Sequence, residues 1–208
     1  MSDDPYVYPD SDVLRNLPGI RDQTALDKFE RVAVALRVEQ GVPTGRFDLN
    51  HLKAIHHHLF QDVYPWAGEI RSVRMSKGDS AFLPARFIET GMRDVHARVQ
   101  SRNHLRELDR QTFVKEVATI IGDLNHIHPF REGNGRTQMH YLLQLANQAG
   151  HPLDVRRIQP DRWINASVTA NRGDYSGMAQ VLHKSVAAWE RVREVRQLRL
   201  IRERGRSI

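Results

Sequence analysis

The stretch between residues 109 and 150 constrains the fold of this chain more than any other feature. Apolar side chains recur there at helical spacing up to Ile127, and the pattern resumes after a short loop. Pro129 cannot continue the first helix, and Gly150 is a typical residue just after the end of the second. The pattern therefore predicts two long helices joined by the loop 128–137.

Most of the remaining chain is also expected to be helical. Asp22 or Thr24 can cap a first helix, and Asp48 opens a second one. The core-facing residues expected on the first helix recur at helical spacing: Leu26, Phe29, Val32, Ala33 and Leu36. Later helices are expected at about 85–100, at about 160–170 and from near Asp174 onward.

Residues 70–84 have a different character. Side chains alternate from Ile70 to Met75, residues 76–79 are typical of a turn, and a second apolar run leads into Pro84. This pattern predicts a short β-hairpin, which must lean on the helices because a lone hairpin is marginally stable in water. Its edges are free to pair with another chain. The expected fold class is therefore all-α, a helical bundle with a small β-hairpin.

Composition excludes several classes of function. The chain has 208 residues and no cysteine, so disulfides, thiolate metal sites and cysteine nucleophiles are ruled out. No apolar run approaches the roughly 18 residues of a membrane span. The acidic start, Met1 to Pro5, lacks the apolar region of a secretory signal. These features fit a domain in a reducing cytosol, with no membrane partner.

The net charge of +6 is unevenly distributed. Residues 191–208 carry seven arginines and two glutamates, a balance of +5, which leaves +1 for residues 1–190. We interpret the basic extension as a solvated helix or spacer, with binding to nucleic acid or an anionic surface as the less favoured alternative.

The loop 128–137 gathers groups suited to binding phosphate. Gly133 and Gly135 permit positive φ and close approach of backbone N–H groups to an anion. The following helix begins here, so its unpaired N–H groups and positive dipole end favour phosphate. Arg136 can bind a second phosphate with its guanidinium. Glu132 would repel phosphate, but it suits a Mg²⁺ ion that bridges to phosphate oxygens.

The same loop contains a group that can accept a proton. His128 has a reference pKa of about 6.5, so it can take a proton from a hydroxyl nucleophile near neutral pH. Asn134 can donate to charge that develops on the attacked phosphorus centre. The simpler alternative is a tight turn between helices with a core histidine. Ten consecutive residues suited to a phosphate site favour the functional interpretation.

The run from His128 matches the motif of the Fic family, His-Pro-Phe-x-Asp/Glu-Gly-Asn-Gly-Arg-x-x-Arg, at every fixed position but the last. Residues 64–71 resemble the family's lead into its hairpin, called the flap. Residues 4–9 resemble the N-terminal arm of the bacterial toxin and effector branch. The resemblance implies a Fic domain at 1–190, with an arm at 1–23 and a flap at about 70–84, followed by the basic extension 191–208.

This resemblance implies an adenylyltransferase. Such an enzyme moves AMP from ATP to a hydroxyl side chain (Tyr, Thr or Ser) of a target protein and releases pyrophosphate. His128 would be the general base and Glu132 the ligand of Mg²⁺. The remaining loop residues would bind the nucleotide: Asn134 and the backbone of Gly133 and Gly135 at the α-phosphate, and Arg136 at the β-phosphate.

The flap is expected to hold the target. In the family the segment around Met75 to Phe82 would clamp a target segment by strand pairing. Lys77, at the expected turn, is a candidate contact to nucleotide or target, although a solvated turn residue is the simpler interpretation. The resemblance offers two targets, the ATPase subunit of a bacterial type II topoisomerase or a host small GTPase. The expected location is correspondingly the bacterial cytoplasm, or a host cell after secretion.

The chain departs from the family pattern at two points. Met139 replaces the final motif arginine, which in the family helps to orient the triphosphate. Three outcomes stay open: a weaker AMP transferase, another transferred group (phosphate, UMP or phosphocholine), or a nucleotide-holding adaptor without turnover. The family's self-inhibitory helix, Ser/Thr-x-x-x-Glu-Gly/Asn, is also absent. The resemblance then suggests inhibition in trans by a small antitoxin, or no such inhibition.

Overall fold

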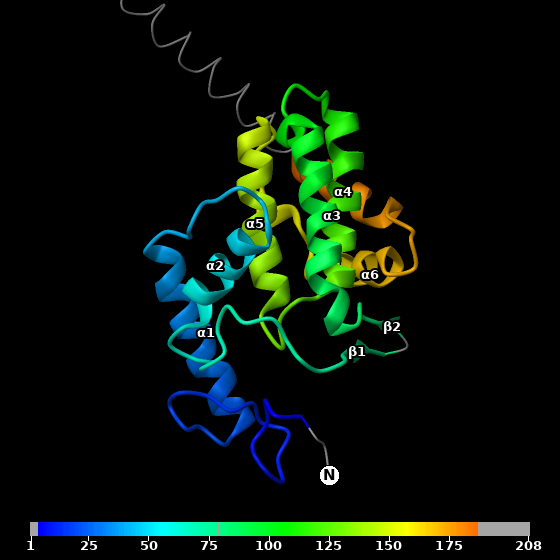
Figure 1. Cartoon of the computed structure of the whole chain (residues 1–208). Helices are drawn as coiled ribbons and strands as arrows, with labels where there is room; N and C mark the ends of the chain where they lie inside the picture. Colours follow the sequence, from blue (N-terminus) through cyan, green and yellow to red (C-terminus); the bar gives the residue numbers. More distant parts are fainter. Residues whose placement is uncertain (1–3, 79, 187–208) are drawn as a thin grey trace, which may run out of the picture. The chain divides into compact units, whose positions relative to one another are not determined.

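The computed structural model describes residues 4–78 and 80–186. Its α-helices are α1 (Gln23–Glu39), α2 (Leu49–Phe60), α3 (Ile88–Ser101), α4 (Arg110–Ile127), α5 (Asn134–Ala149) and α6 (Pro160–Ala170) (Figure 1). Residues 176–186 are also helical. Short 3-10 turns occur at η1 (Ala85–Phe87), η2 (Asn103–Leu105) and η3 (Val155–Arg157). The predicted fold class, helical with a small hairpin, is confirmed. The basic extension 191–208 lies outside the described residues.

The chain divides into two compact units. One comprises Met1–Gln100 and Leu124–Tyr141, and the other comprises Ser101–Asp123 and Leu142–Ile208. Helices α4 and α5 each contribute residues to both units. The loop 128–137 belongs wholly to the first unit.

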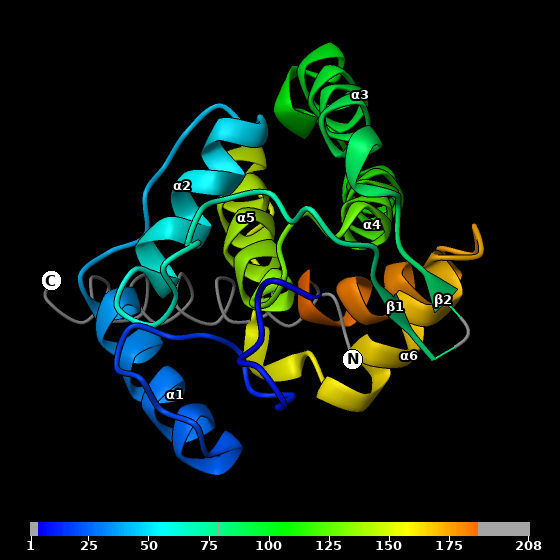
Figure 2. The same ribbon diagram turned by 60° about the horizontal axis from the view of Figure 1, so that its bottom comes forward.

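In the first unit, α1 and α2 pack side by side (Figure 2). Both begin where the sequence predicts. The Asp22 carboxylate accepts a hydrogen bond from Ala25 N at 2.8 Å, and the Asp48 carboxylate accepts one from His51 N at 2.8 Å. Each carboxylate satisfies a backbone N–H that the first turn of the helix leaves unpaired. Leu52, Ile55, Leu59 and Phe60 of α2 are fully buried.

The predicted core face of α1 is only partly correct. Leu26 and Ala33 are buried, but Phe29, Val32 and Leu36 are exposed, the last two by 60% and 55%. The inward face instead consists of the buried Leu26, Ala33 and Val34 with the half-buried Glu30 and Arg37, and it lies about 100° further round the helix. Glu30 and Arg37 can lie on this face because each is paired with an opposite charge.

The hairpin is shorter than the alternation predicts. Strands β1 (Ser76–Lys77) and β2 (Ser80–Ala81) pair antiparallel, with Ser76 opposite Ala81 and Lys77 opposite Ser80 (Figure 2). The predicted turn at 76–79 is therefore displaced, since its first two residues belong to β1. Residues 70–75 form no strand, because Arg71 N donates instead to Pro129 O at 2.9 Å. The segment before β1 is thus bound to the loop between α4 and α5.

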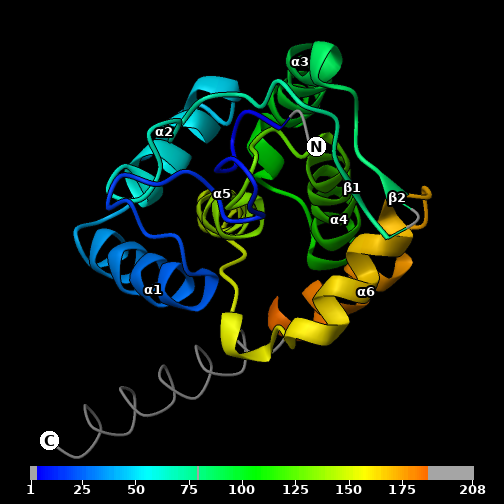
Figure 3. The same ribbon diagram turned by 90° about the horizontal axis from the view of Figure 1, so that it is seen from below.

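The N-terminal arm also contacts this loop. Val7 and Leu14 form an isolated antiparallel bridge within the arm. Asp4 forms an ion pair with Arg131 at 2.9 Å, and Tyr6 OH accepts a hydrogen bond from Ser72 N. Figure 3 accordingly shows the arm beside the N-terminal end of α5. The arm and the flap segment therefore support the loop together.

The second unit is held by contacts between its helices and loops. Asp109 caps α4 by accepting from the N–H groups of Gln111 and Thr112. The His151 ring stacks on Phe113 at 4.4 Å, and Ser185 Oγ donates to Asp154 O at 2.8 Å. Gly150, with φ of +85°, ends α5 at the predicted place. No helix within residues 4–186 combines the length and apolar character that crossing a bilayer requires.

Candidate active site

The loop between α4 and α5 is closed by a pair of hydrogen bonds. Asn134 Oδ1 accepts from Phe130 N at 2.9 Å, and Asn134 Nδ2 donates to Phe130 O at 2.7 Å. Phe130 is fully buried and stacks on His56 with centroids 3.8 Å apart. These contacts fix the loop backbone in one conformation. The predicted contact from Asn134 to phosphate stays a prediction, since both polar atoms of its side chain bind the loop.

Arg71 holds the start of the loop. Its side chain is 1% exposed, and its guanidinium donates to four carbonyl oxygens, those of Val73, Leu83, Ile127 and His128. A charged group this buried is stable only when its donors are satisfied. His128 itself has a φ of +45°, which turns the chain sharply after α4.

The imidazole of His128 is set up to accept a proton. Nδ1 lies 3.2 Å from Asn125 O, and because a carbonyl only accepts, this nitrogen must carry the hydrogen. In the neutral ring Nε2 then holds the lone pair, and it has no hydrogen-bonding partner among the described residues. Burial is the main cause that lowers the pKa of His128 to about 4; the charges of Arg71 and Lys77 act in the same direction, and the hydrogen bond to Asn125 O opposes them. The ring is therefore neutral near pH 7.

Gly133 and Gly135 serve different purposes. Gly133 has a φ of +77°, and a Cβ there would lie 2.3 Å from the Phe60 ring. Only glycine fits this position without displacing Phe60. Gly135 lies in the first turn of α5 and does not have a positive φ, so the predicted use of glycine for a positive φ does not apply at this position. No described atom lies within 4 Å of the place of its Cβ, which leaves this side of the helix start open.

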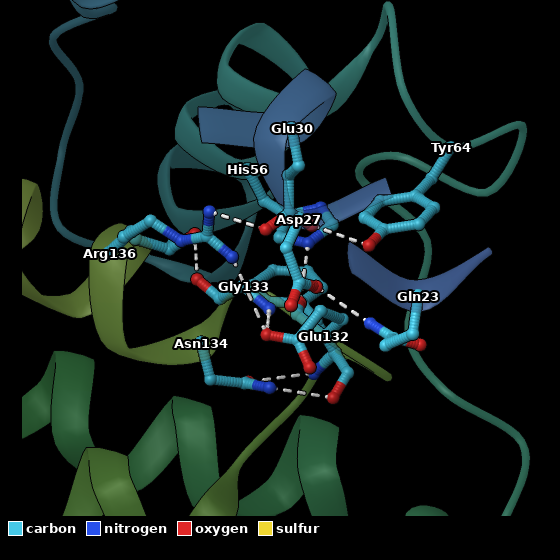
Figure 4. Close-up of polar contacts among 11 residues, drawn as sticks. Gln23, Asp27, Glu30, His56, Tyr64, Glu132, Gly133, Asn134 and Arg136 are labelled. Carbon is cyan, nitrogen blue, oxygen red and sulfur yellow. Dashed lines mark hydrogen bonds and ion pairs between the residues drawn. The ribbon is translucent and has the colours of Figure 1, made fainter. Parts of the chain in front are cut away.

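Arg136 lies between two carboxylates (Figure 4). Nη1 is 2.7 Å from Glu30, and Nη2 is 3.5 Å from Glu132. Its guanidinium also lies over the Phe60 ring, 4.7 Å from the centroid. Glu30 accepts a further hydrogen bond from Tyr64 OH. Sequence reasoning missed Glu30, Tyr64 and Phe60, because no local pattern links them to residue 136.

Glu132 is suited to a shared metal ion. Its side chain is about half exposed, and Oε1 accepts a hydrogen bond from Gly133 N at 2.8 Å. Its backbone carbonyl accepts from His56 Nε2 at 3.0 Å, while His56 Nδ1 accepts from Gly68 N. Within the described chain no three acidic or histidine side chains gather to hold a metal alone. A single carboxylate nevertheless suits Mg²⁺, which commonly completes its coordination with phosphate oxygens and water.

Two further positions flagged in the sequence lie apart from this network. Lys77 lies in β1 and is exposed. Its positive charge lowers the pKa of His128. Met139 is half-buried on α5, one turn after Arg136, and it supplies no charge at the place of the final motif arginine.

Fold and site define a class: a helical domain in which a neutral imidazole lies beside a glycine loop at a helix start. Residues 46–146 match the Fic/DOC family model. A probable protein adenylyltransferase, y4lH from Sinorhizobium fredii, is 38% identical over 185 residues, which is 88% of this chain and 96% of y4lH. The chain belongs to the Fic/DOC family.

Two other relatives extend the comparison. Protein adenylyltransferase VbhT from Bartonella schoenbuchensis is 36% identical over 206 residues, and the match spans 98% of this chain but 43% of VbhT. The crystal structure of BepC from Bartonella tribocorum, a VirB-translocated effector protein with bound AMPPNP, superposes with a TM-score of 0.78. That match has 26% identity and covers 86% of this chain and 94% of BepC.

Proposed function

We propose that this protein is an adenylyltransferase that moves AMP from ATP to a tyrosine, threonine or serine hydroxyl of a target protein. The observation that carries the proposal is the protonation state of His128, with hydrogen on Nδ1 and a lone pair on Nε2. A base of this kind, beside a helix start open at Gly135, can act on a hydroxyl that faces a bound phosphate.

The reaction follows from these groups. The target hydroxyl gives its proton to His128 Nε2, and its oxygen attacks the α-phosphorus of ATP. The bond between that phosphorus and the α–β bridging oxygen breaks, and pyrophosphate leaves. AMP is then joined to the target oxygen. Arg136 binds the β-phosphate. The N–H groups at Gly133 and Gly135 bind the α-phosphate, together with the Asn134 Nδ2 hydrogen that does not donate to Phe130 O.

Glu132 is the residue we assign to Mg²⁺. When bound, this ion neutralises phosphate charge and orients the leaving pyrophosphate. The carboxylate is about half exposed and only weakly paired with Arg136, and turning toward such an ion releases the Gly133 N–H from which it now accepts.

The target docks on the flap. Strands β1 and β2 are two residues long and form one antiparallel pair, so their outer edges keep N–H and C=O groups for an incoming segment. Lys77, exposed on β1, can contact that segment or the nucleotide. The target is a bacterial type II topoisomerase subunit or a host small GTPase. The first target fits a protein that acts in the bacterial cytoplasm and is inhibited in trans by an antitoxin. The second fits a secreted effector, comparable to the VirB-translocated effector protein BepC.

Label transfer tests this proposal. Purified protein is incubated with ATP labelled in the α-phosphate, Mg²⁺ and a bacterial lysate, with H128A as the matched control. We expect a labelled protein that gains the mass of AMP and that H128A does not produce. Absence of transfer with bacterial and host-cell lysates, while the protein still binds nucleotide, would favour the non-catalytic adaptor.

Met139 favours one alternative, the transfer of a different group. Without the final motif arginine, a contact expected to hold the γ-phosphate of ATP is missing, so a donor that lacks a triphosphate, such as a phosphocholine donor, competes better. Unlabelled donors added to the label-transfer reaction separate the two functions: only ATP should suppress labelling if AMP is the transferred group.

A further inference from the structure

The ion pair between Arg136 and Glu30 joins the helix that carries the motif to a helix outside the matched family segment. Glu30 lies on α1, before residue 46, where the family match begins. Its carboxylate is 2.7 Å from Arg136 Nη1 and also accepts from Tyr64 OH. The Phe60 ring supports the face of the same guanidinium. Arg136 is thus held on two sides by residues with no assigned role.

The two partners of this ion pair differ in burial. The Glu30 side chain is 12% exposed, whereas the Arg136 side chain is 37% exposed. The carboxylate is therefore the more buried partner of the ion pair that Figure 4 shows, and the Arg136 side chain keeps exposed surface for a ligand. A carboxylate that blocked the site would lie on the open side.

Glu30 and Glu132 compete for the same guanidinium. Glu132 is the other carboxylate within 4 Å of the Arg136 guanidinium among the described residues, and it is the residue assigned to Mg²⁺. Without Glu30, the guanidinium would be drawn fully to Glu132, four residues earlier on the chain. Each would then neutralise the other, and neither would be available to a metal–phosphate ligand.

We propose that Glu30, oriented by Tyr64, is a positioning residue that holds Arg136 for the β-phosphate of a nucleotide and keeps it away from Glu132. This inference rests on the proposed function, because it takes the ligand of Arg136 to be a nucleotide phosphate. It adds a partner on α1 that sets the geometry of that contact.

Calorimetric titration of ADP and of AMP, each with Mg²⁺, tests the role of Glu30. E30Q keeps the shape of the side chain but removes its charge. We expect E30Q to bind ADP about tenfold more weakly, the loss expected when one charge-assisted contact fails. AMP has no β-phosphate, so its affinity should stay within about twofold. A purely structural role of Glu30 would weaken both ligands alike.

The matched control is D27N. Asp27 lies one turn earlier on α1, is exposed, and accepts a hydrogen bond from the Gln23 side chain. D27N removes the same charge from α1 at a residue that does not contact Arg136, so its affinity for ADP should be unchanged. Y64F keeps the carboxylate but removes the hydroxyl that orients it. It should weaken ADP in the same direction by a smaller factor, and it gives the same comparison if E30Q does not fold.

A double-mutant cycle with R136Q completes the test. If Glu30 acts through Arg136, then adding E30Q to R136Q should cause no further loss of ADP affinity. The proposal is overturned if E30Q or Y64F binds ADP as tightly as the wild type, or if the losses in the cycle add. Tighter ADP binding by E30Q would show that the carboxylate competes with phosphate. Failure of the wild type to bind ADP would instead refute the proposed function itself.

Discussion

The imidazole of His128 lies flat against the ring of Phe82, with centroids 3.7 Å apart and planes 13° apart. Phe82 directly follows β2, and its backbone N–H donates to Met75 O at 3.0 Å. The hairpin proposed to dock the target therefore also covers His128, the proposed base. Removal of this cover should change the chemistry of the base directly.

The variant F82A should raise the pKa of His128. Burial is the main cause that lowers this pKa to about 4, and loss of the ring admits water to the imidazole. We expect the value to move toward the ordinary 6.5, by at least about one unit. NMR titration of the histidine ring nitrogens measures it. F87A, at an exposed phenylalanine of η1, is the control and should leave His128 unchanged.

Acid should destabilise the fold partly through His128. Because its pKa is about 4 in the folded protein and about 6.5 unfolded, the unfolded chain binds the proton first as pH falls. The free energy of unfolding should therefore decrease between pH 6.5 and 4, by on the order of 3 kcal/mol from this group. Urea unfolding at several pH values measures the slope. H128N should give a shallower slope, and equal slopes would contradict the low pKa.

Alanine at the two loop glycines should separate folding from nucleotide binding. G133A places a Cβ 2.3 Å from Phe60 at a φ of +77°, so it should destabilise the protein by about 2–4 kcal/mol. G135A meets open space in a helical turn and should leave stability unchanged or slightly higher. Its methyl group would nevertheless obstruct a phosphate, so ADP affinity should fall. Melting curves and calorimetry distinguish the two, and normal ADP binding by G135A would place the phosphate elsewhere.

Loss of Arg71 should destabilise the flap and the loop together. R71M has a similar volume but leaves four carbonyls without their donor. We expect the free energy of unfolding to fall by about 2–4 kcal/mol. R74M, at an exposed arginine of the same segment, is the control for loss of charge. An effect below about 0.5 kcal/mol would mean that water replaces the guanidinium.

An arginine at position 139 should restore selection of the triphosphate. Met139 is half-buried one turn after Arg136, so M139R would place a second guanidinium on the same face of α5. We expect ATP affinity to rise about three- to tenfold, with a smaller change for ADP. Q148R adds the same charge at an exposed position of α5 and should have no effect. Equal gains for ATP and ADP would argue against a contact beyond the β-phosphate.

The features that sequence predicts here are those with local causes. Asp22, Asp48 and Gly150 mark helix ends through their own side chains or backbone, and all three lie where expected. The loop 128–137 is recognisable because its functional groups are adjacent in the chain. The predicted core face of α1 is partly wrong because its cause is not local in the sequence. Glu30 and Arg37 are half-buried beside partners at positions 136 and 62, and hydrophobic periodicity cannot predict such pairs.

Arg71 and the strand length of the hairpin illustrate the same limit. The alternation from Ile70 is real, but Arg71 bonds to the distant loop rather than to a neighbouring strand. Tyr64 and Phe60 likewise enter the site through contacts that only the folded chain creates.

The ion pair between Asp4 and Arg131 has a practical consequence for anyone who redesigns this protein. Arg131 lies inside the motif, and its counter-ion comes from the fourth residue of the chain. Removal of the first residues, or fusion of a tag there, would change the contacts of the loop between α4 and α5. Kinetic data from shortened versions should therefore be compared with D4N before any loss is attributed to chemistry.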